Sequence, residues 1–373
     1  MADGKTTDNG DLPYMIPALY MPVPVRPHAH ADQVVRGVEA WLWRVGLFEV
    51  EEYRRVYRNL RLGEVFSTCH PTGNIARLIA IAPAYMLAFF ADNPQTGDEH
   101  ASEFLQGMTG GLLGLTPPQV IKLIADPGID AFLTSPLAKA FLAANRPLRA
   151  TTSPGKYECY ITRFLEWFGA ESRHAAQSRR TLDEALRHRL VTAGMPVVAA
   201  YTAIAYPELT EEDARSREAA AVWELSALTT AMHNDLYSGY TELYRDGELR
   251  PDSATGGNTI PAFAHEYGIT IHQAAQRVAE LADRAIAEAV RRVHVLARQQ
   301  APAVLIDYLN TALAYPATAL SWYPQQMTGR YRSPGLDLSS VTVTQAPRPA
   351  ATGAPGITCI DHLWNTDTTH QVR

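Results

Sequence analysis

Apolar residues recur along most of the chain at the spacing of an α-helix. Residues 272–296 read HQAAQRVAELADRAIAEAVRRVHVL, and their apolar side chains fall on one face of a 3.6-residue repeat. The residues of this stripe are Val278, Leu281, Ala285, Ala289, Val293 and Leu296. Alternation of apolar and polar residues, the pattern of a half-buried strand, is nearly absent. The pattern therefore predicts an all-α protein.

Proline and glycine divide the helical stretches into about ten pieces. They cluster in segments such as LGLTPPQ, TSPGK, TAGMP and RPDSATGGN. TEED at 210–213 places a threonine before acidic residues, which is typical of the first turn of a helix. We find neither an internal repeat nor a linker between domains, so we expect a single helical domain.

The two ends of the chain differ in composition from this helical part. Residues 1–13 are polar, and the segment after Pro334 contains APRPAATGAPG, which is rich in proline, alanine and glycine. We expect a disordered N-terminus at 1–13, an α-helical domain at 14–334 and a mostly flexible C-terminal tail at 335–373.

Composition narrows the class of protein. The chain has 373 residues, 46% of them hydrophobic, which is enough for a large core. Its net charge of −6 argues against nucleic acid as a partner. Its three cysteines lie far apart and predict neither a disulfide framework nor a zinc site. Since no signal peptide and no run of about eighteen apolar residues occurs, we expect a cytoplasmic protein without a membrane span.

The stretch NDLYSGYTE, residues 234–242, carries three oxygen-bearing side chains at intervals of four. On a helix, Asn234, Ser238 and Glu242 lie within a strip about 80° wide and can converge on one point. Carboxylate, amide and hydroxyl oxygens together suit a hard cation such as Mg²⁺. A solvated polar face is the alternative, but Lys and Arg are absent from residues 219–244, and this absence disfavours it.

The pattern NDxxSxxxE resembles the NSE metal motif of class I terpene synthases. The family has a second, aspartate-rich metal motif, which the stretch AYMLAFFADNPQTGDE at 84–99 resembles in a degenerate form. Asp92 follows two phenylalanines at the end of this apolar helix. Asn93 stands where the family has a second aspartate, and whether Asn93, Asp98 or Glu99 completes the motif stays open.

Two further segments resemble the diphosphate-binding parts of the same family. SWYPQQMTGRYRSP contains a late tryptophan followed by Arg330 and Tyr331, in the family's order. LRHRLVTAGMP resembles the segment with the diphosphate-sensing arginine, and Leu190 replaces one of its arginines. Arg187 and Arg189 are both candidates, and Arg189 is favoured. Arginine suits this role because its planar guanidinium offers several fixed donors to a diphosphate.

The resemblance covers residues 20 to 334 and implies a single-domain, all-α class I terpenoid synthase fold around a central apolar cavity. It implies that Asp92, Asn234, Ser238 and Glu242 bind Mg²⁺, with three ions present when the substrate is bound. The cofactor is thus Mg²⁺, and a homodimer is left open.

The implied activity is that of a terpene cyclase, a lyase that ionises and cyclises a linear prenyl diphosphate. Phe89 and Trp322 are candidates for the surface that lines the carbocation, although a plain core role is the alternative for both. Small residues in VVAAYTAIAY and at Ala227 and Ala231 favour a roomy cavity. Geranylgeranyl diphosphate is therefore favoured over farnesyl diphosphate, whereas product skeleton and stereochemistry are not predicted.

Two other functions are compatible with these residues. One is a prenyltransferase that uses the same fold, and the other is a non-catalytic helical protein that binds an isoprenoid. GMTGGLLG at 107–114 lacks the spacing of a nucleotide-binding loop, and GxxxxGK[ST], GxSxG and HExxH motifs are absent from the sequence. Phosphoryl-transfer, hydrolase and zinc chemistry are therefore not supported.

Overall fold

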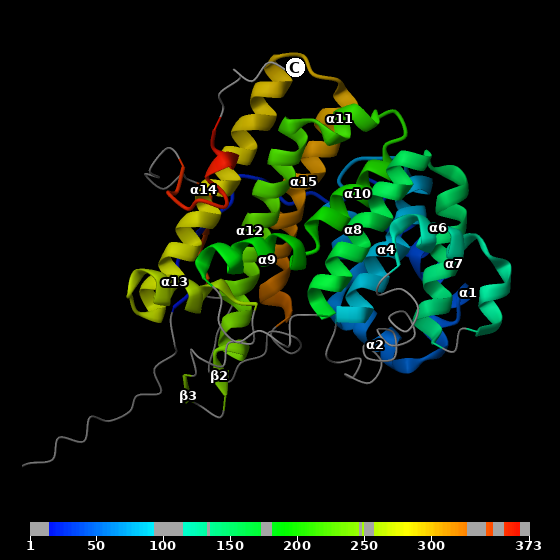
Figure 1. Cartoon of the computed structure of the whole chain (residues 1–373), viewed down its shortest axis with the longest axis horizontal. Helices are drawn as coiled ribbons and strands as arrows, with labels where there is room; N and C mark the ends of the chain where they lie inside the picture. Colours follow the sequence, from blue (N-terminus) through cyan, green and yellow to red (C-terminus); the bar gives the residue numbers. More distant parts are fainter. Residues whose placement is uncertain are drawn as a thin grey trace, which may run out of the picture.

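The computed structural model describes residues 15–92, 115–132, 135–172, 181–245, 248–249, 257–326, 341–345 and 354–365. Almost all of these residues belong to helices, which pack side by side into one body (Figure 1). The prediction of an all-α protein is confirmed.

The first half of the described chain forms one side of the bundle in Figure 1. Its α-helices are α1 (Ala31–Arg44), α2 (Glu51–Leu60), α3 (Leu62–Cys69), α4 (Ile75–Asp92), α6 (Pro117–Ala125), α7 (Pro136–Thr151) and α8 (Pro154–Ser172). Short 3₁₀ turns at Leu47–Glu49 and Pro127–Phe132 connect some of them.

The second half contains the two longest of the described helices. Its α-helices are α9 (Leu182–Thr192), α10 (Met195–Ala205), α11 (Glu211–Arg215), α12 (Arg217–Glu242), α13 (Thr259–Tyr267), α14 (Ile271–Arg298) and α15 (Ala303–Trp322). Two more 3₁₀ turns lie at Tyr323–Gln326 and Asp361–Leu363. Helix α12 packs against α9, α10, α13, α14 and α15 and is therefore the central helix of this half.

Local sequence signals explain where several helices begin. Thr270 Oγ1 accepts a hydrogen bond from the main-chain N–H of Gln273 over 3.2 Å, which satisfies a donor in the first turn of α14. The predicted stripe of α14 faces the core, where Val278 and Ala285 are fully buried. Thr210 caps α11 by accepting from the N–H of Asp213 over 2.9 Å, as the TEED stretch predicts.

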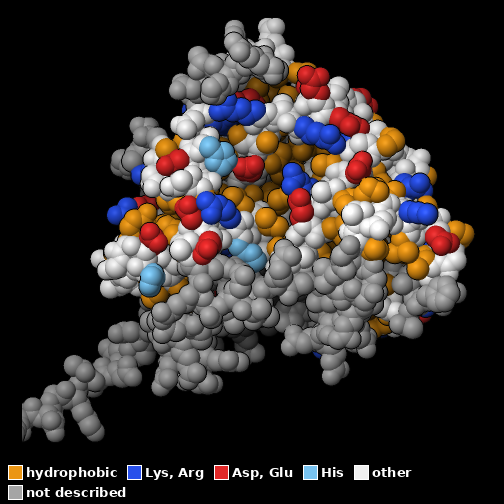
Figure 2. Space-filling model, in the orientation of Figure 1, with side chains coloured by type: hydrophobic (Ala, Val, Ile, Leu, Met, Phe, Trp, Pro, Cys, Tyr) orange, Lys and Arg blue, Asp and Glu red, His pale blue; other side chains and the backbone are white. Residues whose placement is uncertain are grey.

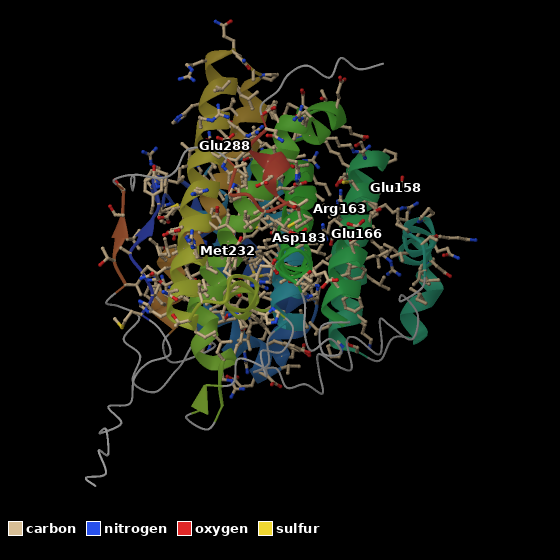
Figure 3. The ribbon with its side chains drawn as sticks, turned by 60° about the vertical axis from the view of Figure 1, so that its left-hand side comes forward. Glu158, Arg163, Glu166, Asp183, Met232 and Glu288 are labelled. Atoms are coloured by element: carbon tan, nitrogen blue, oxygen red, sulfur yellow. The ribbon has the colours of Figure 1, made fainter. Side chains whose placement is uncertain are left out.

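Charged side chains lie on the face of the bundle drawn in Figure 2, and most of the described buried side chains are apolar. On the face drawn in Figure 2, basic and acidic side chains are interspersed among apolar ones. In Figure 3, Met232 of α12 lies inside the bundle, where it is fully buried, whereas the exposed Glu158 and Glu166 belong to the surface of α8. None of the described helices has both the length and the apolar character that a bilayer crossing requires.

Two stretches near the C-terminus contact parts of the chain that are distant in sequence. Strand β4 (Val343–Thr344) pairs in parallel with β1 (Leu19–Tyr20). A separate pair follows α12, where β2 (Tyr244–Arg245) pairs antiparallel with β3 (Glu248–Leu249). In residues 354–365, Ile360 and Leu363 are almost completely buried, and the carbonyl of Leu363 accepts from Nη2 of Arg292 on α14 over 2.8 Å. The sequence composition did not predict these contacts. The expected domain boundaries themselves stay a prediction.

Candidate functional site

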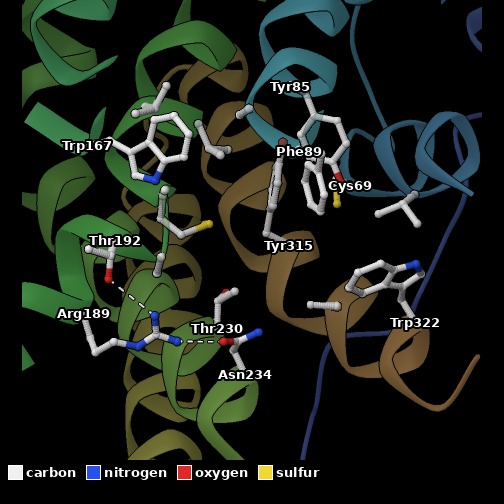
Figure 4. A pocket seen from close by; sticks show the side chains of 18 of the residues that line it. Cys69, Tyr85, Phe89, Trp167, Arg189, Thr192, Thr230, Asn234, Tyr315 and Trp322 are labelled. Carbon is white, nitrogen blue, oxygen red and sulfur yellow. Dashed lines mark hydrogen bonds between the residues drawn. The ribbon is translucent and has the colours of Figure 1, made fainter. Parts of the chain in front are cut away.

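A cavity of about 310 Å³ lies between the two halves of the bundle. Helices α3, α4, α8, α9, α10, α12 and α15 all contribute to its wall. Most of the lining side chains are apolar or aromatic, and Tyr85, Phe89, Trp167, Tyr315 and Trp322 are labelled in Figure 4. A wall made mostly of aromatic and small aliphatic side chains disfavours water in the cavity.

Polar side chains gather at one edge of the cavity. Asn234 and Glu242 from α12 line it, together with Arg189 from α9. Ser238 lies between Asn234 and Glu242 on α12 and is only 6% exposed, although it does not reach the cavity wall. The structure thus brings Asn234, Glu242 and Arg189 to one cavity, as the sequence predicts for a site with these residues.

Arg189 contacts the first residue of the NDxxSxxxE stretch. Its Nη2 donates to Oδ1 of Asn234 over 2.8 Å (Figure 4). The same nitrogen lies 2.6 Å from Oδ1 of Asp235. Arg187 instead has a side chain that is 59% exposed, and it pairs with Asp183 on the surface. Residues two positions apart on a helix, such as Arg187 and Arg189, differ by about 200° in direction. This difference explains why one arginine faces the cavity and the other faces solvent. Of the two candidates, Arg189 is the one at the site.

Asp235 is a buried carboxylate held by several donors. One of its oxygens, Oδ2, accepts from the main-chain N–H of Thr259 over 2.8 Å and from the Thr259 hydroxyl over 2.6 Å. Burial raises the pKa of Asp235 to about 6, and the nearby charge of Arg189 and the bonds from Thr259 partly offset this rise. Asp235 therefore fastens α9 and the start of α13 to α12.

Asn258 contacts Glu242, the last residue of the NDxxSxxxE stretch. Its Nδ2 donates to the main-chain oxygen of Asp235 over 2.9 Å and to Oε2 of Glu242 over 3.0 Å. The sequence analysis did not single out Asn258 or Thr259. An asparagine directly before a helix is an N-cap signal, but this signal gives no information about a contact with Glu242.

The backbone between α9 and α10 also reaches the cavity. Ala193 and Gly194 line it, and Gly194 adopts φ of 73°, a left-handed conformation that glycine adopts without steric cost. Ala193 is the C-cap of α9 and Gly194 is the N-cap of α10, so the chain turns between the two helices at the cavity wall. The TAGMP segment is therefore a helix break, as its composition predicts.

The opposite part of the wall is aromatic. The rings of Phe89 and Trp322 lie edge to face with centroids 6.2 Å apart, and the Trp322 Nε1 donates to the carbonyl of Leu60 over 2.7 Å. The hydroxyls of Tyr201 and Tyr315 are 2.7 Å apart and share a hydrogen bond. Phe89 and Trp322 thus lie where π faces would be exposed to a bound molecule.

Some sequence-based expectations differ from this geometry or cannot be compared with it. Ala227 and Ala231 are buried but do not line the cavity, whereas Val197, Val198 and Tyr201 of the VVAAYTAIAY stretch do. Asp92 is the last residue of α4, near the lining residues Ala88 and Phe89, but its side chain lies outside the described part of the structure. Outside the described residues altogether lie Asn93, Asp98, Glu99, Arg330 and Tyr331.

The donor set at the cavity edge fits a hard cation. Asn234 and Glu242 supply an amide oxygen and a carboxylate at this edge, and the buried Ser238 carries a hydroxyl between them on the same face of α12. These are ligands that Mg²⁺ accepts while it keeps several waters. Among the described residues, no group of three or more His, Cys, Asp and Glu side chains could hold a metal ion. A soft or zinc-type centre is therefore not found in that part of the chain.

Comparison with known proteins identifies related sequences. Residues 125–288 match the family model described as terpene synthase family 2, C-terminal metal binding. The chain is 25% identical over 294 residues to (+)-(1(10)E,4E,6S,7R)-germacradien-6-ol synthase of Streptomyces pratensis, covering 77% of this chain and 79% of that protein. It is 23% identical over 361 residues to phomopsene synthase of Allokutzneria albata, covering 94% of this chain and 96% of that protein.

Solved structures share the fold. The SVS_A2 protein from ancestral sequence reconstruction superimposes with a TM-score of 0.70 at 19% identity, covering 94% of this chain and 98% of that chain. Hedycaryol synthase in complex with nerolidol superimposes with a TM-score of 0.60 at 19% identity, covering 83% of this chain and 100% of that chain. At this level of identity, the likeness shows a common helical architecture.

Proposed function

We propose that the chain is a class I terpene synthase and that it performs the Mg²⁺-dependent ionisation and cyclisation of a linear prenyl diphosphate, with release of diphosphate; the family model over residues 125–288 and the similarity to two terpene synthases support this. The enzyme class is that of a carbon–oxygen lyase. The observation that carries the proposal is one cavity with an aromatic wall and an edge that bears Arg189, Asn234 and Glu242.

The first step is departure of the diphosphate. The bond between C1 and oxygen breaks, and both electrons leave with the diphosphate, so an allylic cation remains on the hydrocarbon. When bound, Mg²⁺ neutralises the charge that develops on the leaving group. Asn234, Ser238 and Glu242 would hold one ion, and Asp92 would face the others, three in all by resemblance to the family. Arg189, and by resemblance to the family Arg330 and Tyr331, would donate hydrogen bonds to the diphosphate oxygens.

The second step is ring closure inside the apolar cavity. Water would quench the cation, and the apolar wall excludes it. The faces of Phe89 and Trp322 provide negative potential without a nucleophilic atom. The shape of the wall holds the chain so that a distal double bond meets the cationic carbon. Transfer of a proton from the cyclised cation to the released diphosphate then yields the terpene.

Geranylgeranyl diphosphate is the favoured substrate, ahead of farnesyl diphosphate. Small residues along the wall support this choice, because Ala88, Ala193, Gly194 and Ala319 leave room that larger side chains would fill. Substitution of a small lining residue by a larger one shortens the chain that a cavity accepts.

The test is incubation of the enzyme with geranyl, farnesyl and geranylgeranyl diphosphate, each separately and with Mg²⁺. Extraction and mass analysis of the hydrocarbon should reveal a cyclic C20 product when geranylgeranyl diphosphate is supplied without an acceptor molecule. A prenyltransferase would need a second molecule as acceptor, and a non-catalytic binder would give no Mg²⁺-dependent turnover. A cyclic C15 product in place of the C20 product would overturn the choice of chain length but not the reaction.

A further inference from the structure

We propose that Asn258 is a positioning residue that holds the carboxylate of Glu242 in place for the metal ion. The inference rests on the proposed function, because Glu242 is a ligand only in a metal-dependent enzyme. Asn258 lies outside the NDxxSxxxE stretch, at the N-cap of α13, and is itself 6% exposed.

The amide of Asn258 is engaged at both of its ends. Its Oδ1 accepts from the main-chain N–H of Ile260 over 3.0 Å and caps α13. Its Nδ2 carries two hydrogens, and it donates to the carbonyl of Asp235 over 2.9 Å and to Oε2 of Glu242 over 3.0 Å. The side chain of Asn258 thus connects the main chain of Ile260, the main chain of Asp235 and the side chain of Glu242.

The two acceptors of Nδ2 lie at the two ends of the predicted metal stretch. Asp235 directly follows Asn234, and Glu242 comes seven residues after Asp235, almost two helical turns along α12. A fixed amide that contacts both positions sets the distance from the start of the stretch to the carboxylate at its end.

Glu242 needs such support more than the other candidate ligands do. It is the last residue of α12 and is exposed, whereas Ser238 is buried within the helix. A long side chain at a helix end samples several rotamers unless a partner selects one. The bond from Asn258 engages Oε2, and we assign the other oxygen, Oε1, to the cation. Since the amide is neutral, it orients the carboxylate without adding a positive charge that would repel a divalent ion.

The position of Asn258 is itself fixed by its neighbour. Thr259 donates to the buried Asp235 carboxylate from both its main-chain N–H and its hydroxyl, so the start of α13 stays against α12. Replacement of the Asn258 side chain should therefore leave the backbone at this position in place.

The decisive variant is Asn258→Ser. Serine caps a helix about as well as asparagine, so α13 keeps its N-cap acceptor. The shorter side chain lacks the amide that reaches Glu242. We expect the melting temperature to change little, while the affinity for Mg²⁺, measured by isothermal titration in the presence of inorganic pyrophosphate, falls about 10- to 100-fold. In turnover assays, kcat should return toward the wild-type value at high Mg²⁺ concentration.

Two comparisons separate positioning from a structural role. Thr270→Ala removes the N-cap of α14 and leaves Asn258 and Glu242 unchanged, so it should lower the melting temperature and leave Mg²⁺ affinity unchanged. In a Glu242→Gln background, Asn258→Ser should cause no additional loss of affinity, because Asn258 acts through Glu242.

An Asn258→Ser protein with wild-type Mg²⁺ affinity would overturn the proposal and leave Asn258 as a helix cap. An additional loss in the Glu242→Gln background would also overturn it. If wild-type enzyme binds Mg²⁺ with pyrophosphate but converts none of the prenyl diphosphates, the proposed function fails, while the titration still decides the role of Asn258.

Discussion

The guanidinium of Arg189 donates from Nη2 to Oδ1 of Asn234 over 2.8 Å, although 45 residues separate them in the sequence. The same guanidinium lies 2.6 Å from the buried carboxylate of Asp235. The predicted diphosphate-sensing arginine and the first predicted metal ligand therefore belong to one network. A substitution at either residue should therefore change the position of the other side chain.

The Arg189–Asp235 pair should contribute to stability as well as to binding. Arg189→Met removes the positive charge next to a carboxylate that is 1% exposed, and breaking such a buried pair costs about 3 kcal/mol in free energy of unfolding. The double variant Arg189→Met/Asp235→Asn should regain part of this loss, because the buried negative charge is then absent as well. Urea-induced unfolding of the three proteins measures both values, and equal stabilities would contradict the pairing.

Glu242→Gln and Asp92→Asn should each reduce turnover about 100-fold or more. Each substitution removes a carboxylate charge from a predicted metal ligand, and the loss of several kcal/mol of transition-state stabilisation corresponds to this factor. Circular dichroism should show an unchanged helical signal in both variants. Full activity of both would refute the metal assignment, whereas full activity of Asp92→Asn alone would limit it to α12.

Phe89→Leu should alter product distribution and reduce the rate about 2- to 30-fold, because it removes a π face worth about 0.5–2 kcal/mol to a cation in the cavity. The neighbouring Phe90 provides a matched control, since it is fully buried but does not line the cavity. Phe90→Leu should lower stability and leave the products unchanged. Gas chromatography of both variants checks this, and identical product profiles for Phe89→Leu and wild type would argue for a plain core role.

His70 should make the fold sensitive to acid. Burial lowers the pKa of His70 to about 4, while its ring accepts or donates within a network of the Phe66 carbonyl and the Thr202 hydroxyl. The unfolded chain binds a proton near pH 6.5, so the stability from neutral His70 is complete above that pH and is lost as the pH falls toward 4. The loss amounts to about 3 kcal/mol.

Denaturant unfolding at several pH values measures this effect in wild type and in His70→Gln. The variant should show a flatter dependence between pH 6.5 and pH 4. His233, whose pKa burial lowers to about 3, is present in both proteins, so the difference between the two curves isolates His70. Parallel curves would contradict the prediction.

Much of the fold could be predicted because helix formation depends on local spacing. The stripe on α14 and the caps at Thr210 and Thr270 need only residues within a few positions of one another. The contacts of residues 354–365 could not be predicted in this way. Ile360 and Leu363 are buried against helices far away in the sequence, and a composition rich in proline and glycine gives no information about such partners.

The candidate site divides along the same line. The sequence by itself determined the helical class and the four-residue spacing of Asn234, Ser238 and Glu242, because both follow from the turn of one helix. Only the tertiary structure decided that Arg189 rather than Arg187 faces the cavity, and that Asn258 contacts Glu242. These contacts depend on how separate helices pack against each other, and packing distances between segments are not encoded in the spacing of residues along any one of them.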